Sequence, residues 1–110
     1  MKTKSLMELA SIIRSKNSGP YELTLDVFFK TPAIYAKVKR QGQISRKLIQ
    51  RLYHVSAKQV LDIIYFDPVR AVKVTIARPI PSGAIDDSDV YGAQQHMPLV
   101  DARIPWDASR

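Results

Sequence analysis

A short polar segment near the start of the chain contains the residue types that bind anions. The segment consists of Arg14, Ser15, Lys16, Asn17, Ser18 and Gly19. Backbone amides in a tight turn, together with cationic side chains, can bind a carboxylate or a phosphate. Thr24 and Asp26 follow two residues apart, so they share one face of a strand. We expect all eight residues to bind a ligand or a partner. The alternative is a capped polar turn beside a salt-bridged strand.

A second polar segment, residues 82–96, is rich in amide donors and acceptors. Its candidate ligand- or partner-binding residues are Asp89, Tyr91, Gln94, Gln95 and His96. Irregular segments of this kind commonly carry binding functions. His96 with Asp89 or Asp101 also has the residue types of an acid–base pair. The alternative is a loosely ordered terminus.

Other chemistries find little support in the sequence. The chain has no cysteine, which excludes disulfides, thiolate zinc sites and a cysteine nucleophile. Asp87, Asp89 and Gly92 fit the start of a calcium loop, but Tyr91 and Pro98 stand at later ligand positions. No glycine-flanked serine and no phosphate-binding glycine loop occurs. We therefore expect no metal and no cofactor, and we assign no catalytic residue.

Composition and charge limit the remaining choices. The chain has 110 residues, of which 45% are hydrophobic and 25% charged, as in a soluble domain with one core. Its formal net charge is +7, which favours acidic partners. The basic residues are spread along the chain, as on a solvated surface. No stretch approaches the ~20 apolar residues of a membrane span, so we expect a cytoplasmic protein without a membrane partner.

The elements that would position these residues begin with a helix at Ser5. Ser5 and Glu8 have the spacing of a capping box. Apolar residues from Leu6 to Ile13 recur at helical spacing, and residues 16–20 end the helix. The polar segment would then be a turn between this helix and the next strand.

The next elements are a strand and two helices. Residues 21–29 alternate between apolar and polar, as in a half-buried strand. Thr31 and Pro32 then cap and open a second helix, and Gly42 ends it. A third helix begins at Ser45.

Two further strands complete the predicted core. Residues 60–66 are nearly all apolar, which is typical of a central strand covered on both faces. Asp67 and Pro68 form a turn that pairs this strand with residues 72–76 as an antiparallel hairpin. We expect an α+β fold, with a small antiparallel or mixed sheet of three to four strands and helices on one face. Residues 1–81 would form the core domain. Residues 82–110 would form an irregular tail on the core or on a partner, with a further strand near Leu99–Ile104.

A helix-turn-helix is an alternative reading of residues 48–63. The apolar positions and the basic charge fit a DNA-binding motif. However, its second helix would run through residues 60–66, which favour a strand, and into Pro68. Asp62 on the exposed face would also repel phosphate. We therefore disfavour nucleic acid as a partner.

Three runs of the chain carry a resemblance to a known family. They are residues 13–26, residues 66–68 and residues 89–96. They resemble a bacterial family of unassigned function, which is similar to the small ferredoxin-fold partner of AtuA, the acyclic terpene utilisation protein. The resemblance extends over residues 5–105. It implies a ferredoxin-like fold, as a separate chain beside the large subunit or as a domain fused to it.

The resemblance also implies a function. The chain would be an accessory or small subunit of an AtuA-like protein in the breakdown of branched or terpenoid acids or their CoA thioesters. It would contribute to an anionic-substrate site at the interface and would not catalyse alone. Its expected partners are the AtuA-like large subunit, an acyl-CoA or carboxylate ligand, and a second copy of the chain. The alternatives are a stand-alone binding protein or enzyme for an anionic metabolite and, less favoured, a DNA-binding protein.

Overall fold

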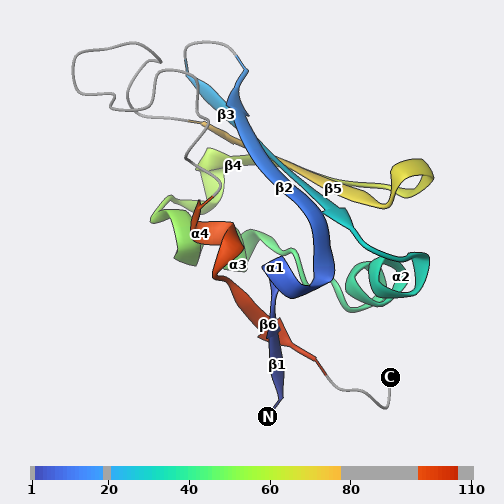
Figure 1. The fold of residues 1–110 in the computed structure, drawn as a ribbon. Helices are drawn as coiled ribbons and strands as arrows, with labels where there is room; N and C mark the ends of the chain where they lie inside the picture. The colour runs from blue at the N-terminus through green and yellow to red at the C-terminus, as the bar shows by residue number, and fades with distance from the viewer. Residues whose placement is uncertain (1, 19–20, 78–96, 107–110) are drawn as a thin grey trace.

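A four-stranded antiparallel sheet forms the centre of the fold in the computed structural model, which describes residues 2–18, 21–77 and 97–106 (Figure 1). Its strand order is β2-β3-β5-β4, and a second sheet pairs β1 with β6. The strands are β1 (Thr3–Ser5), β2 (Ala10–Asn17), β3 (Glu22–Phe29), β4 (Val60–Phe66), β5 (Ala71–Ala77) and β6 (Arg103–Pro105). The α-helices are α1 (Leu6–Leu9), α2 (Pro32–Gln41), α3 (Arg46–Tyr53) and α4 (Met97–Val100). This arrangement confirms the α+β prediction and is compatible with a ferredoxin-like fold.

The hydrophobic core lies between one face of the large sheet and the helices (Figure 1). Leu23, Leu25, Val27 and Phe29 of β3 are all buried on this face, which confirms the predicted alternation for residues 22–29. Tyr21, the first residue of the predicted strand, lies before β3 and is exposed. Alternate residues of β5 join the buried residues of β3. The helices therefore cover one face of the sheet, and the opposite face carries the intervening residues of β3, among them Thr24, Asp26 and Phe28.

Local capping signals place α2 and α3 where the sequence predicts them. Thr31 Oγ1 accepts a hydrogen bond from the amide of Ile34 at 3.1 Å. Ser45 Oγ accepts one from the amide of Leu48 at 3.2 Å. Gly42 ends α2 with φ +59°, a left-handed conformation that glycine adopts without steric cost.

The predicted first helix is wrong over most of its length. The capping box is present, since the Glu8 carboxylate accepts from the Ser5 amide at 2.9 Å and Ser5 Oγ from the Glu8 amide at 3.3 Å. The helix nevertheless ends at Leu9, and Ala10–Asn17 forms strand β2. Pairing with β3 overrides the helical spacing, because β3 is a buried strand whose backbone groups need partners on both edges.

The prediction that residues 60–66 form a central strand is half right. The strand is present as β4, and it pairs with β5 as the predicted antiparallel hairpin. However, β4 lies at the edge of the sheet, and Leu61, Ile64 and Phe66 are exposed. Because this segment is a strand, it cannot supply the second helix of a helix-turn-helix, and that alternative is wrong.

The end of the chain contributes to the core. Leu99, Ala102 and Ile104 are buried, and β6 pairs with β1 at the opposite end of the sequence. The expected strand near Leu99–Ile104 is therefore shorter and preceded by α4. The predicted boundary between residues 81 and 82 lies outside the described residues. In the described part of the chain, no helix has both the length and the apolar character needed to cross a membrane.

Candidate functional site

The face of the large sheet opposite the helices, called the open face below, carries an apolar row that crosses all four strands. The strand register places Ile12 beside Phe28, Phe28 beside Ala71, and Ala71 beside Phe66. Ile12 is 51% exposed and Phe66 53%. Ile64 of β4, two residues from Phe66, extends this surface and is 46% exposed. Large apolar side chains gathered on one exposed surface are typical of an interaction site.

A charged row lies next to the apolar row on the open face. Arg14, Asp26, Lys73 and Ile64 follow one another across the strands. Arg14 Nε lies 3.1 Å from Asp26 Oδ2, and the Arg14 guanidinium carbon lies 4.9 Å from the centre of the Phe28 ring. The arginine is therefore held by an ion pair and by an aromatic face at once.

A third row of the open face is polar. It consists of Lys16, Thr24, Thr75 and Asp62. Thr24 is 2% exposed, and its hydroxyl donates to the Lys16 carbonyl at 3.3 Å. This hydroxyl is therefore satisfied within the sheet and has a structural role in joining β2 to β3.

The structure places the predicted site residues of the first segment on two faces. Arg14, Lys16, Thr24 and Asp26 share the open face, as expected for Thr24 and Asp26. Ser15 and Asn17 alternate with them and are half-buried on the opposite face. The expected helix-to-strand turn is wrong, because these residues form β2.

The remaining predicted residues fall at or beyond the β2–β3 turn. The Ser18 amide donates to the Glu22 carbonyl at 2.9 Å and closes that turn. Gly19, Asp89, Tyr91, Gln94, Gln95 and His96 lie outside the described residues. Within residues 2–18, 21–77 and 97–106, no three His, Asp or Glu side chains gather as metal ligands would.

Asp67, in the run of residues 66–68 that carries part of the family resemblance, has a structural role in a cluster with Tyr35 and Lys39. The Tyr35 hydroxyl donates to Asp67 Oδ1 at 2.5 Å, and Lys39 Nζ lies 2.8 Å from the same oxygen. Burial, and then the Asp67 carboxylate, raise the pKa of Tyr35 above its usual value. The Lys39 and Tyr35 hydrogen bonds hold the pKa of Asp67 below its usual value. This cluster ties α2 to the turn between β4 and β5.

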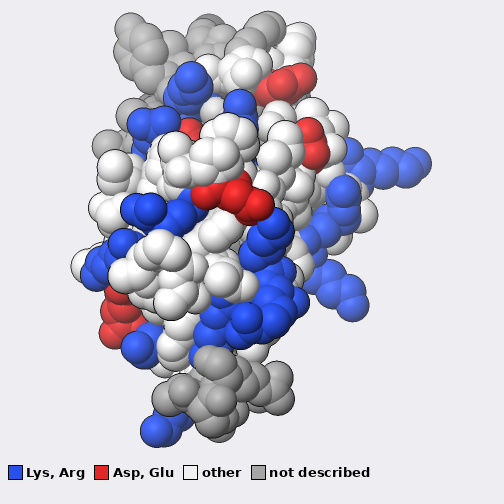
Figure 2. Space-filling view, turned by 90° about the vertical axis from the view of Figure 1, so that its right-hand side faces the viewer, with Lys and Arg blue, Asp and Glu red and all other residues white. Residues whose placement is uncertain are grey.

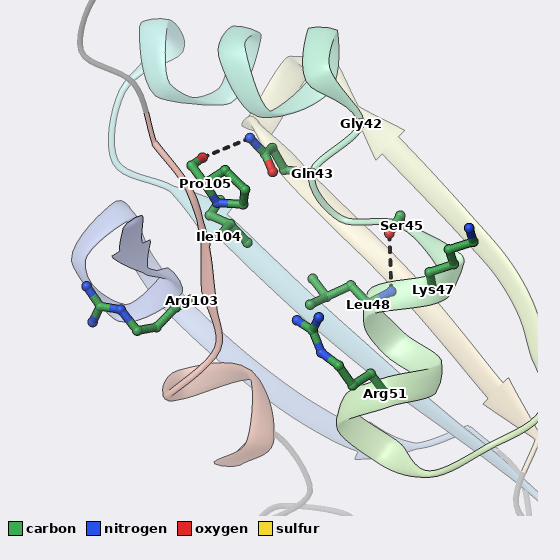
Figure 3. Close-up of a pocket in the computed structure, with 9 residues that line it drawn as sticks. All are labelled: Gly42, Gln43, Ser45, Lys47, Leu48, Arg51, Arg103, Ile104 and Pro105. Carbon is green, nitrogen blue, oxygen red and sulfur yellow. Dashed lines mark hydrogen bonds between the residues drawn. The ribbon is translucent and has the colours of Figure 1, made fainter. Parts of the chain in front are cut away.

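A basic pocket lies on the helical side of the molecule, between α3 and β6 (Figure 3). Its volume is about 230 Å³, and its lining includes Gln43, Lys47, Leu48, Arg51, Arg103 and Ile104. None of the described residues that line it carries a carboxylate. Sequence reasoning missed this pocket because its cations come from distant segments and seemed to be scattered surface charge. The four-residue spacing of Lys47 and Arg51 on one helix face was the available signal.

Basic side chains also dominate other parts of the surface. Figure 2 shows the face that carries α2 and the turn between β4 and β5, where lysine and arginine side chains gather in a patch below the centre, beside uncharged residues. Of the α2 residues, Lys39 and Arg40 are exposed, while Lys37 is buried with its ammonium 4.2 Å from the centre of a Trp106 ring. The basic side chains are therefore distributed over several faces of the molecule.

Comparisons with known proteins place the chain in one family. The family model described as "Domain of unknown function (DUF4387)" matches residues 6–103. No curated protein and no solved structure matches the chain. The match extends from the start of α1 to the first residue of β6, so it includes the open face and all of the pocket lining except Ile104 and Pro105.

Proposed function

The chain belongs to the DUF4387 family, for which no function is assigned, and we propose that it is an accessory subunit that docks on a larger protein through its open face. The partner is an AtuA-like large subunit, and the assembly acts in the breakdown of branched or terpenoid acids or their CoA thioesters. The choice of partner and pathway rests on the sequence resemblance. The choice of surface rests on the apolar row.

The observation that supports docking most strongly is that this apolar row reaches β4, an edge strand that pairs only with β5 among the described residues. Ile12, Ile64 and Phe66 are each about half exposed on the open face. Exposed apolar edge strands promote unwanted pairing, and soluble proteins protect them with charges, bulges or a cover. The first half of β4 has two of these protections, a bulge-like irregular register at Val60–Asp62 and the charge of Asp62. The second half, residues 63–66, has neither a bulge nor a charged residue. A partner that covers this half supplies the missing protection.

The charged row suggests the chemistry of the partner and of the shared ligand. The open face carries three cations beside the apolar row, Arg14, Lys16 and Lys73. It carries two carboxylates there, Asp26 and Asp62. A partner surface with an apolar centre and an acidic rim complements this pattern. Where the partner leaves one of these cations uncovered at the edge of the interface, that cation contributes to a site for an anionic substrate.

The experiment is co-purification of the tagged chain with the AtuA-like large subunit, using a matched pair of variants. Phe66→Glu places a charge in the apolar row, while Met7→Glu places one on α1, where the native side chain is 63% exposed. We expect the wild type and Met7→Glu to retain the large subunit. Phe66→Glu should weaken binding by roughly 30-fold or more, as for an aromatic anchor at an interface centre.

Three outcomes contradict the proposal. The wild type could fail to bind the large subunit, or Phe66→Glu could bind as tightly as the wild type with its melting temperature unchanged. In the third, the chain alone forms a dimer that Phe66→Glu dissociates, while binding of the large subunit is unaffected. The open face would then be an interface between two copies.

A further inference from the structure

Arg14 is held in a fixed position on the open face. Its Nε donates to Asp26 Oδ2 at 3.1 Å, and its guanidinium carbon lies 4.9 Å from the centre of the Phe28 ring. The Asp26 side chain is 14% exposed, whereas that of Arg14 is 61% exposed. The arginine is therefore anchored on its inner side, while its outer side faces away from the sheet.

The contact with Asp26 uses only part of the guanidinium. Two terminal nitrogens carry further N–H donors, in a planar fork that matches a carboxylate. Among the described residues, the ion pair through Nε is the only one that Arg14 forms. Lys73 is the cross-strand neighbour of Asp26 on the other side, so this row of the sheet has two cations for one carboxylate. The row therefore carries an excess of positive charge.

A protein that docks on the open face must cover Arg14. Phe28 belongs to the apolar row, and the Arg14 guanidinium lies against its ring. Before docking, water can bind the exposed N–H donors. Once water is removed, an unpaired donor on a buried guanidinium is costly. A partner without an acceptor at this point would therefore lose affinity, and a neutral acceptor would leave the excess charge uncompensated.

We propose that Arg14 binds a carboxylate of the AtuA-like large subunit, on an Asp or Glu side chain, through its terminal nitrogens. This inference rests on the proposed function and names the contact that fixes the position of the subunit on the open face. Arginine is enriched among the residues that dominate interface affinity. A guanidinium that a ring and a carboxylate already hold also loses little conformational freedom on binding.

The test is the affinity of the large subunit for the wild-type chain and for variants, measured by isothermal titration calorimetry. Arg14→Gln should weaken binding by roughly 30-fold or more, because it leaves the carboxylate of the subunit buried without its partner. Arg14→Lys keeps the charge but not the planar fork, so its affinity should lie between those of the wild type and Arg14→Gln. Lys58→Gln makes the same charge change on an exposed turn and should bind as the wild type does.

Two further measurements separate a contact with the subunit from a role within the sheet. Arg14→Gln should keep the melting temperature of the wild type, because an ion pair with so exposed an arginine contributes little to stability. Asp26→Asn removes the internal partner of Arg14 but keeps the arginine and its charge. It should therefore weaken binding of the subunit much less than Arg14→Gln does.

The outcomes distinguish this inference from the proposed function. If the subunit binds Arg14→Gln as tightly as the wild type, the inference is wrong and the docking proposal stands. Loss of acyl-CoA binding by that assembly would then assign the arginine to the ligand. If Asp26→Asn weakens binding as much as Arg14→Gln, the ion pair within the sheet is what matters, and the inference is also wrong. Failure of the wild type to bind the subunit would refute both.

Discussion

Among single residues, Asp67 belongs to one of the runs that carry the family resemblance, and its role in the structure is to stabilise the fold. Its carboxylate accepts from the Tyr35 hydroxyl and pairs with Lys39, so it joins α2 to the end of β4. Its place before Pro68 predicted only a turn. Its partners lie about thirty positions earlier, and nothing in the local sequence indicates them.

The depressed pKa of Asp67 predicts a pH-dependent contribution to stability. A carboxyl whose folded-state pKa lies below its unfolded value stabilises the fold above the unfolded pKa and loses that contribution as the pH falls through the folded one. Asp67→Asn should therefore lower the melting temperature at neutral pH. The difference from wild type should narrow as the pH falls below about 4, the ordinary range of an aspartate. Thermal unfolding followed by circular dichroism at a series of pH values checks this.

Lys39 provides the control for that prediction. Lys39→Gln removes the largest cause of the lowered pKa of Asp67. Its melting-temperature difference from wild type should therefore also narrow as the pH falls. Because the two residues are direct partners, the double variant should be less destabilised than the sum of the single ones. A melting-temperature difference for Asp67→Asn that stays constant from neutral pH to acid would rule out the ion pair as its source.

At the scale of elements, the helices were predictable because their signals are local. Thr31, Pro32, Gly42 and Ser45 mark the ends of α2 and α3 within a few residues of the hydrogen bonds that they form. The strand β2 was not predictable in this way. Its first residues continue the helical spacing of α1, and pairing with β3, a tertiary effect, decides the outcome.

The exposure of β4 could not be predicted from the chain alone. Apolar residues at successive positions usually indicate a strand buried on both faces. In β4 the residues that point away from the core, Ile64 and Phe66, are exposed. The docking proposal explains this pattern. One face of β4 packs on the core of the chain, and the partner protein would bury the apolar residues on the other face.

The charge pattern of α3 predicts that its first turn can be stabilised by an acidic residue. Lys47→Glu replaces a cation in the first turn by an anion, which the helix dipole favours. We expect it to raise the free energy of unfolding by about 0.3–1 kcal/mol. Chemical denaturation measures this effect. Lys47→Gln should fall between wild type and Lys47→Glu. A destabilised Lys47→Glu would show that the lysine has a structural partner after all.

At the scale of the whole molecule, two surfaces lie on different sides of one sheet. The open face carries the apolar and charged rows, while the pocket lies among the elements on the helical side. Neither surface was visible in the sequence as a unit. The rows require the register of four strands, and the pocket requires α3 and β6 to meet. The sequence did place Thr24 and Asp26 on one face, because alternation along β3 is a local property. It did not place Arg14 and Lys16 beside them, because residues 14–18 were expected to form a turn and instead belong to β2 and its end.

If the chain docks as proposed, a larger protein covers the open face. Hydrogen–deuterium exchange of the chain, alone and with the AtuA-like large subunit, can detect this cover. We predict that the large subunit slows amide exchange in residues 12–16 of β2 and residues 62–66 of β4, and leaves α3 unchanged. Slowed exchange confined to the helical side, or no change at all with the subunit in excess, would contradict the claim.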